Sequence, residues 1–179
     1  MMEKIRLELP SKEREKEALE YKAEFKENDS ELHGDGGMEK AEDYNRWVQS
    51  RKDSHNEISF PEGFVPASTY FAVRESDNRI VGMVDLRHRL NDWLKETWNG
   101  HIGLSVRPTE RKKGYATEVM KLALREYKKM GIDSVIVGCD EDNIGSKKTI
   151  LKCGGKLMNE SMQDGKAHLG FEIKVGGVE

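Results

Sequence analysis

The sequence lacks the features that mark membrane, secreted and zinc-binding proteins. No stretch approaches the roughly 20 consecutive apolar residues that a membrane-spanning helix needs. The first nine residues carry charges where a signal peptide has an apolar core, so we expect a cytoplasmic protein. The two cysteines, Cys139 and Cys153, are too few for a disulfide framework and lack the paired spacing of a zinc site.

The charge balance and the scattered histidines argue against two further classes. Lys and Arg number 30 against 33 Asp and Glu, whereas a nucleic-acid-binding domain is usually basic. The five histidines form no His-x-x-x-His pair, so we expect no metal. We also expect no nucleic-acid partner, despite a small basic cluster at Arg107, Arg111, Lys112 and Lys113. A chain of 179 residues without repeats suits one domain, residues 1–179.

The most informative stretch lies between residues 100 and 131. Residues 100–107 alternate between apolar and small or polar side chains, which predicts a half-buried strand. Pro108 ends it, because proline has no N–H for the next ladder bond. Apolar residues then recur in steps of three and four, which predicts an amphipathic helix that ends at Gly131. The basic turn between them, with Gly114, predicts a phosphate site at a helix N-terminus.

Strand and helix patterns alternate along the rest of the chain. Residues 133–139 form a short apolar run, so the strand, helix and second strand predict two parallel, neighbouring strands. The polar 28–37 segment is either a plain surface connection or a lip on the substrate side. Further strands are expected at 5–9, 68–74, 79–87, 156–162 and 168–175, and helices from Ser11, around 41–48 and after residue 143.

These motifs resemble the GNAT superfamily of acyl-CoA-dependent N-acetyltransferases. That superfamily carries Arg/Gln-x-x-Gly-x-Gly/Ala between a strand and a long helix, and this chain has Arg111-x-x-Gly114-x-Ala116. Its second motif, Asn-x-x-Ser opening a short helix, is matched by Asn143-Ile-Gly-Ser146. The resemblance covers nearly the whole chain and extends to bacterial acetyltransferases of similar length. It implies an α/β fold with a central mixed sheet of six or seven strands, a V-shaped splay between two parallel strands, and helices on both faces.

The resemblance also implies where acetyl-CoA would bind as the cosubstrate. Its pantetheine arm would pair with the main chain at Leu104, Ser105 and Val106. Its diphosphate would lie on the turn and the first helical residues, namely Arg111, Lys112, Lys113, Gly114, Tyr115, Ala116 and Thr117. Asn143 and Ser146 either cap the short helix or, for Asn143, hold the pantetheine amide, and these two roles are compatible.

The residues for proton transfer depart from the family pattern. His101 stands where many relatives have a glutamate, and an imidazole with a pKa of about 6.5 can accept a proton at neutral pH. It is our candidate base, with Asp85 and Glu62 as weaker alternatives and a strand-end histidine bonded to a neighbouring loop as the structural one. The usual acid, a tyrosine, is replaced by Ile150. Another donor, release of the thiolate to water, or binding without fast turnover stay open.

Two functions from different classes follow. The first is transfer of an acetyl group from acetyl-CoA to the primary amine of a small molecule or peptide, by direct attack. The second is a non-catalytic acyl-CoA-binding regulatory domain. The expected partners are acetyl-CoA, an amine acceptor and, as an option, a second copy of the chain in a homodimer.

Overall fold

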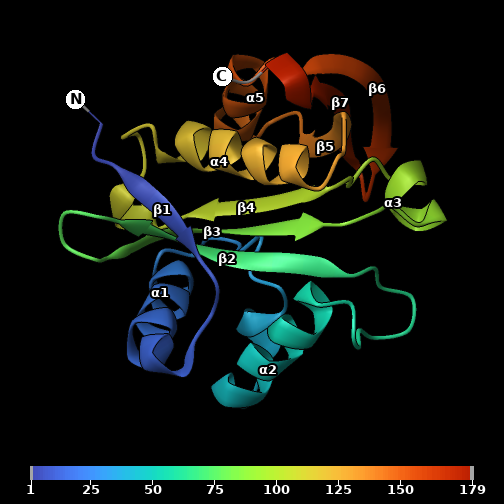
Figure 1. Cartoon of the computed structure of the whole chain (residues 1–179). Coiled ribbons are helices and arrows are strands. Elements are labelled where there is room, and N and C mark those ends of the chain that lie inside the picture. Colours follow the sequence, from blue (N-terminus) through green and yellow to red (C-terminus); the bar gives the residue numbers. More distant parts are fainter. Residues whose placement is uncertain (1, 178–179) are drawn as a thin grey trace.

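The computed structural model describes residues 2–177 and places helices on both faces of the strands (Figure 1). The helices are α1 (Glu15–Glu27), α2 (Tyr44–His55), α3 (Asp92–Glu96), α4 (Tyr115–Lys129) and α5 (Ile144–Lys152). The strands are β1 (Ile5–Glu8), β2 (Ala67–Arg74), β3 (Ile80–Arg87), β4 (Ile102–Val106), β5 (Ser134–Asp140), β6 (Lys156–Gln163) and β7 (Lys166–Lys174). α1 and α2 lie on one side and α4 on the other, so the predicted α/β fold class is confirmed.

The strands form two sheets rather than the single mixed sheet that was predicted. One sheet has the order β1-β2-β3-β4 and the other the order β5-β7-β6. Every pairing within them is antiparallel. Within residues 2–177, the one bridge between the two sheets joins Gly100, just before β4, to Val137 of β5. The parallel ladder that we expected between these two strands does not form.

A bend at Gly100 and the side chain of His101, which precedes β4, explain the missing ladder. Gly100 has a φ of +68°, and the next N–H, that of His101, donates to the carbonyl of Ile136 at 2.7 Å. The carbonyl of His101 still accepts from the Arg87 N–H of β3 at 2.8 Å. The Ile136 N–H, which a further ladder bond would use, donates instead to His101 Nδ1 at 2.9 Å. β4 therefore begins at Ile102, later than predicted.

The apolar core lies in two clusters on the two sides of the first sheet. One cluster joins α4 and α5 to both sheets and includes Val119, Leu124 and Phe171. The other fills the space between the first sheet and α1 and α2, around Tyr21 and Trp47. Because α4 packs on β3, β4 and, through the same cluster, on β5 and β7, this helix holds the two sheets together.

Helix boundaries differ from the predicted ones where a capping residue decides them. α2 begins after Asp43, whose carboxylate accepts the Arg46 N–H at 3.0 Å, and it extends to His55. α4 begins directly after the predicted basic turn, with Gly114 at its N-cap in a left-handed conformation, φ +88°. α3 lies in a segment that was expected to be a plain connection.

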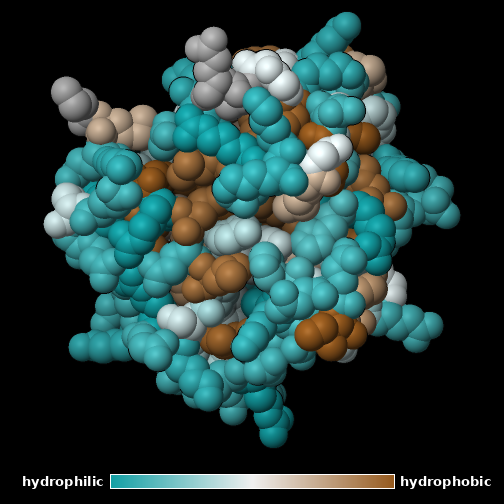
Figure 2. Space-filling model, viewed as in Figure 1, coloured by the Kyte–Doolittle hydropathy of each residue, from teal (hydrophilic) through white to brown (hydrophobic). Residues whose placement is uncertain are grey.

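The surface is mostly hydrophilic in the view of Figure 2, with hydrophobic residues gathered in a band across the middle of that face. The band lies over the sheet, between the α4 layer and the layer of α1 and α2. Among the helices of residues 2–177, none combines the length and the apolar character that crossing a bilayer requires.

Candidate functional site

The first part of the site is the edge of β4 that faces away from β3. Ser105 pairs with Met83 and Gly103 pairs with Asp85. In an antiparallel pair, alternate residues direct their N–H and C=O groups to the partner strand, so the amides of Leu104 and Val106 point the other way. No further strand pairs with them in the described part of the chain. An extended ligand with amide groups can therefore pair with this edge.

Ser105 differs from Leu104 and Val106 in the groups that it can offer to a ligand. Its main chain is used by β3, so the predicted main-chain contact with pantetheine is not available at this residue. Its buried hydroxyl instead forms a 2.9 Å hydrogen bond with the hydroxyl of Tyr21 on α1. Burial raises the pKa of Tyr21, although the bond to Ser105 acts in the opposite direction. Tyr21 and Ser105 thus place two bonded hydroxyl groups at β4.

The second part of the site is the turn between β4 and α4. Lys112 and Gly114 both have left-handed φ values, +61° and +88°. Within residues 2–177, the backbone N–H groups of residues 112–117 have no hydrogen-bond partner. Six unpaired donors at the N-terminus of a 15-residue helix, together with the helix dipole, favour an anion such as a diphosphate.

Two of the three cationic side chains of this turn are already engaged by protein groups, and the third, that of Lys112, is exposed. Arg111 donates to the Val106 carbonyl at 3.2 Å and to the Ser30 hydroxyl at 2.7 Å. Lys113 forms a 2.8 Å ion pair with buried Glu110. Buried Tyr115 anchors the start of α4, and Ala116 and Thr117 follow as small residues in its first turn. The backbone amides, more than the side chains, make this turn an anion site.

The third motif lies at the start of α5. The Asn143 carboxamide oxygen accepts the Ser146 N–H at 3.1 Å, so Asn143 caps this helix. The capping alternative is what the structure shows, and the contact of Asn143 with pantetheine stays a prediction. Ile150 is buried in the core next to Gly155, so no proton donor stands at this position.

The environment of His101 is not that of a general base. Its Nδ1 accepts the Ile136 N–H, and its ring lies edge-on against Tyr127 of α4, with centroids 5.7 Å apart. When Nδ1 accepts, the proton of a neutral imidazole is on Nε2, so no lone pair is free. Burial, helped by the charge of Arg87, lowers the pKa of His101 to about 4. Its role as base stays a prediction that this geometry opposes, and the bonded strand-end histidine fits better.

The two alternative bases lie in unlike environments. Asp85 is buried opposite Gly103, and its carboxylate accepts from the Thr69 hydroxyl at 2.7 Å. Burial raises the pKa of Asp85, with the Thr69 hydrogen bond acting against the shift. Glu62 is exposed in the segment between α2 and β2. Of these two carboxylates, only Asp85 lies beside β4.

The 28–37 segment covers β4 next to its open edge. Gly34 has a φ of +72°, and a side chain there would come within 2.5 Å of the Gly103 carbonyl and 2.8 Å of the Leu104 nitrogen. The segment is also tied to the end of β4 through Ser30 and Arg111. These contacts favour the substrate-side lip over the plain connection.

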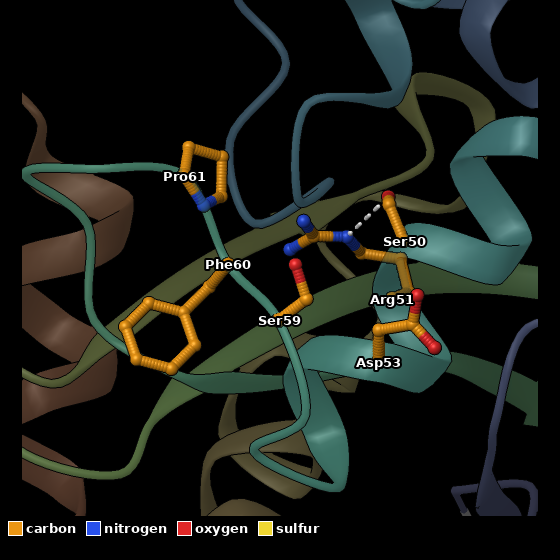
Figure 3. Close-up of a pocket in the computed structure, with 6 residues that line it drawn as sticks. All are labelled: Ser50, Arg51, Asp53, Ser59, Phe60 and Pro61. Atoms are coloured by element: carbon orange, nitrogen blue, oxygen red, sulfur yellow. Dashed lines mark hydrogen bonds between the residues drawn. The ribbon is translucent and has the colours of Figure 1, made fainter.

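A cavity of about 340 Å³ adjoins this lip, between α2 and the segment that leads to β2 (Figure 3). The Arg51 guanidinium points into it and donates to the Ser50 hydroxyl at 3.3 Å, while the ring of Phe60 points away. The Arg51 side chain also lies against Gly36 of the lip. The cavity therefore places one cation and several polar groups beside the lip.

Two further site residues escaped the sequence analysis. His168 on β7 is buried, its Nδ1 lies 3.2 Å from a carboxylate oxygen of Asp140 on β5, and its Nε2 has no partner in the described structure. His168 was expected to begin one strand and Asp140 to follow the end of another, and only the register of β5 on β7 brings them together. No local motif marks such a pair.

Comparison with known proteins identifies the family of this chain. The model of the acetyltransferase (GNAT) domain matches residues 14–156. The chain belongs to the GNAT acetyltransferase family. No curated protein matches this GNAT chain. In residues 2–177 of this family member, no group of three or more His, Cys, Asp or Glu residues could hold a metal ion.

Solved structures share the GNAT fold at low sequence identity. The microcin C7 self-immunity acetyltransferase in complex with acetyl-CoA and AMP is 20% identical with a TM-score of 0.68, covering 95% of this chain and 92% of that one. The ribosomal-protein-S5-alanine acetyltransferase from Vibrio fischeri is 12% identical with a TM-score of 0.71, covering 100% and 97%. The ribosomal L7/L12 alpha-N-protein acetyltransferase in complex with coenzyme A is 12% identical with a TM-score of 0.68, covering 95% and 93%.

Proposed function

We propose that this GNAT protein transfers an acetyl group from acetyl-CoA to the primary amine of a small molecule or peptide. The observation that carries the proposal is the open edge of β4 leading directly into a turn of unpaired amides at the N-terminus of α4. Two of the structural neighbours contain acetyl-CoA or coenzyme A, which supports the same ligand here. The proposal includes a cytoplasmic location. It also includes a homodimer as an option, which light scattering would test.

The ligand would follow the chain from the turn back along β4. Its diphosphate would accept from the amides of residues 112–117, with Gly114 leaving room for its approach. Its pantetheine amides would pair with Leu104 and Val106, and Asn143 would add a side-chain contact. Fixing the thioester along a rigid strand supplies orientation, and an amide of β4 could stabilise the developing oxyanion.

Replacement of Gly114 by alanine tests the diphosphate site, with Gly131 as the matched control. Both glycines have left-handed φ values, +88° and +75°, at opposite ends of α4. Alanine therefore introduces a similar backbone strain of about 1 kcal/mol at each position. Only Gly114 lies in the turn of unpaired amides, so Gly114→Ala should weaken acetyl-CoA binding about tenfold or more in calorimetry. Gly131→Ala should bind like the wild type, and equal affinity of both variants would refute the assignment.

The buried Ile150 keeps a second function in view. Because no hydroxyl stands at the position of the usual acid, the chain could bind acyl-CoA without catalysis. A thiolate with a pKa of about 8.5 is nevertheless a tolerable leaving group near neutral pH, which favours the enzyme. Release of free thiol from acetyl-CoA with a panel of amines separates the two functions, and tight binding without release would support the binding domain.

A further inference from the structure

We propose that His168, held in place by Asp140, is the general base that removes a proton from the acceptor ammonium. The inference rests on the proposed function and names the residue that performs its first step. It moves the base from the predicted β4 position to β7, on the second sheet. The two histidines differ in the one property that a base needs, a free nitrogen lone pair directed at the reacting groups.

The pair has the geometry of an oriented base. His168 Nδ1 lies 3.2 Å from Asp140 Oδ1. An ionised carboxylate only accepts hydrogen bonds, so Nδ1 carries the proton and Nε2 keeps its lone pair. The His168 side chain is 6% exposed, and its Nε2 is buried without a hydrogen-bond partner in residues 2–177. A buried polar atom without a partner is rare in a folded protein, which points to a ligand that completes it.

The free nitrogen lies where β4 and β5 stop pairing. Val137 forms the bridge to Gly100, and Gly138 is the next residue of β5. A side chain at Gly138 would come within 2.6 Å of His168 Nε2, so the imidazole occupies the space beside this glycine. A pantetheine that runs from the phosphate turn past Val106 and Leu104 approaches the same bridge. Its thioester end would therefore meet Nε2.

A strained segment packs beside His168, against two glycines of β5 and β7. The carbonyl of Trp98 lies on Gly138, and its indole lies on Gly170, within 2.4 Å of where a side chain would begin. Trp98 has a φ of +56°, an uncommon conformation for a bulky residue and one that clusters at functional sites. The Gln163 side chain holds the segment by donating to the Thr97 carbonyl at 2.6 Å.

The charges around His168 are few. Asp140 on β5 is the charged group in contact with it in the described structure. Ser161, its register partner on β6, and Trp98, which covers its neighbourhood, are both neutral. The carboxylate stabilises the imidazolium that forms when Nε2 takes a proton. The hydrogen bond from a neutral imidazole to Asp140 then becomes an ion pair.

In the proposed reaction, the acceptor nitrogen loses two protons, and its new N–C bond replaces the C–S bond of the thioester. The acceptor ammonium gives one proton to Nε2 and becomes a neutral amine. Its lone pair then forms the N–C bond to the thioester carbonyl, and the C–S bond breaks as the tetrahedral intermediate collapses. The sulfur leaves as a thiolate. Through solvent, it receives the second proton that the attacking nitrogen loses as it becomes an amide. His168 returns its own proton to water, and the products are the N-acetyl amine and free coenzyme A.

His168→Gln, a replacement of similar size, is the principal test, with two acceptors of different basicity. With an alkylamine that is protonated at neutral pH, kcat should fall roughly 100-fold or more. With an amine that is already neutral at the assay pH, no base is needed, and the loss should be much smaller. Acetyl-CoA affinity, measured by calorimetry on the same variant, should match the wild type. An equal loss with both amines would overturn the proposal.

Asp140→Asn tests the positioning role by a readout that packing alone does not move. An amide can donate to Nδ1 as well as accept from it, so the Nε2-protonated tautomer becomes populated. Long-range proton–nitrogen NMR on the full chain should show a protonated Nδ1 in the wild type and a shifted tautomer in the variant. A wild-type spectrum with the proton on Nε2 would overturn the proposal.

The competing histidine supplies the last comparison. His101→Asn retains an acceptor for the Ile136 N–H and should keep the wild-type pH dependence of kcat/KM. If His101→Asn removes that pH dependence while His168→Gln keeps it, His101 is the base and the inference is refuted. If the wild type binds no acetyl-CoA, the proposed function itself fails. If it binds and turns over with no effect of His168→Gln, only the inference fails.

Discussion

At the scale of single residues, His101 joins the two sheets with both its main chain and its side chain. Its N–H donates to the Ile136 carbonyl, and its Nδ1 accepts the Ile136 N–H. The hydroxyl of Tyr127 donates to the carbonyls of His101 and Arg87 at 2.8 and 3.0 Å. One buried phenol and one imidazole thus satisfy the backbone at the point where β4 meets β5.

His101→Ala should therefore destabilise the protein even if catalysis is elsewhere. The substitution leaves the Ile136 N–H without a partner, which costs about 1–3 kcal/mol for a buried donor. His101→Asn places an oxygen close to the position of Nδ1 and should recover most of the loss. Urea unfolding at pH 7 measures both variants. Equal destabilisation by Ala and Asn would show that the hydrogen bond to Ile136 contributes little.

Residues whose role is local were predictable from the sequence, and those that act across the fold were not. Pro108, Gly114 and Asn143 follow a strand end, complete a turn and cap a helix through local chemistry of their own, and all three do so in the structure. The partners of His101 and His168 lie 35 and 28 positions away along the chain. Such pairs depend on strand register, which no single-residue rule supplies.

At the scale of elements, the 28–37 lip and β4 behave as one unit. The backbone of Gly34 lies directly on Gly103, so the lip can approach the strand only where both residues lack a side chain. The same strand offers its open edge, next to the lip, to the cosubstrate. A change in the position of the lip on β4 should therefore alter the binding of both acetyl-CoA and the acceptor.

Gly34→Ala tests this coupling, with Gly37→Ala as its matched control in the same segment. Both glycines have left-handed φ values, +72° and +87°, so both variants take on about 1 kcal/mol of backbone strain. Only the side chain at position 34 would collide with β4, because position 37 faces open space. Gly34→Ala should lower Tm by several degrees more than Gly37→Ala and should raise the KM for acetyl-CoA. Similar Tm and KM values for the two variants would contradict the contact.

Periodicity predicted most elements but not the way in which they pair. All the described strands and α1, α2, α4 and α5 correspond to segments that were predicted from the sequence. α3 was missed because it is short and packs only Leu94 into the core. The division into two sheets depends on the bend at Gly100 and the hydrogen bonds of His101, which the strand pattern of residues 100–107 does not reveal.

At the scale of the whole molecule, histidines and carboxylates divide acid sensitivity into two pH ranges. Burial lowers the pKa of His55 and lowers that of His101 to about 4, whereas an unfolded chain has values of about 6.5. Their contribution to stability is complete above pH 6.5 and is lost as pH falls toward the folded values. Hydrogen bonds from Arg74 hold the pKa of Asp77 at about 2, so its contribution is lost only at lower pH.

The free energy of unfolding should therefore fall between pH 6.5 and 4 by roughly 2 kcal/mol, allowing for the partial exposure of His101. The double variant His55→Gln, His101→Asn should be flat over this range and should still unfold at lower pH with the carboxylates. Urea titrations at half-unit pH steps would show it. A wild-type slope that the double variant retains would assign the acid sensitivity to other groups.

The Trp98 indole rests on Gly170, and its carbonyl rests on Gly138, the register partner of that glycine across β5 and β7. An aromatic ring supplied from outside the sheet thus replaces a side chain that the strand lacks. Lifting this segment would uncover His168 and loosen both strands at once, so the two events share one equilibrium. Amide hydrogen exchange at the two glycines would measure the opening equilibrium of this segment in the free protein, without any acceptor.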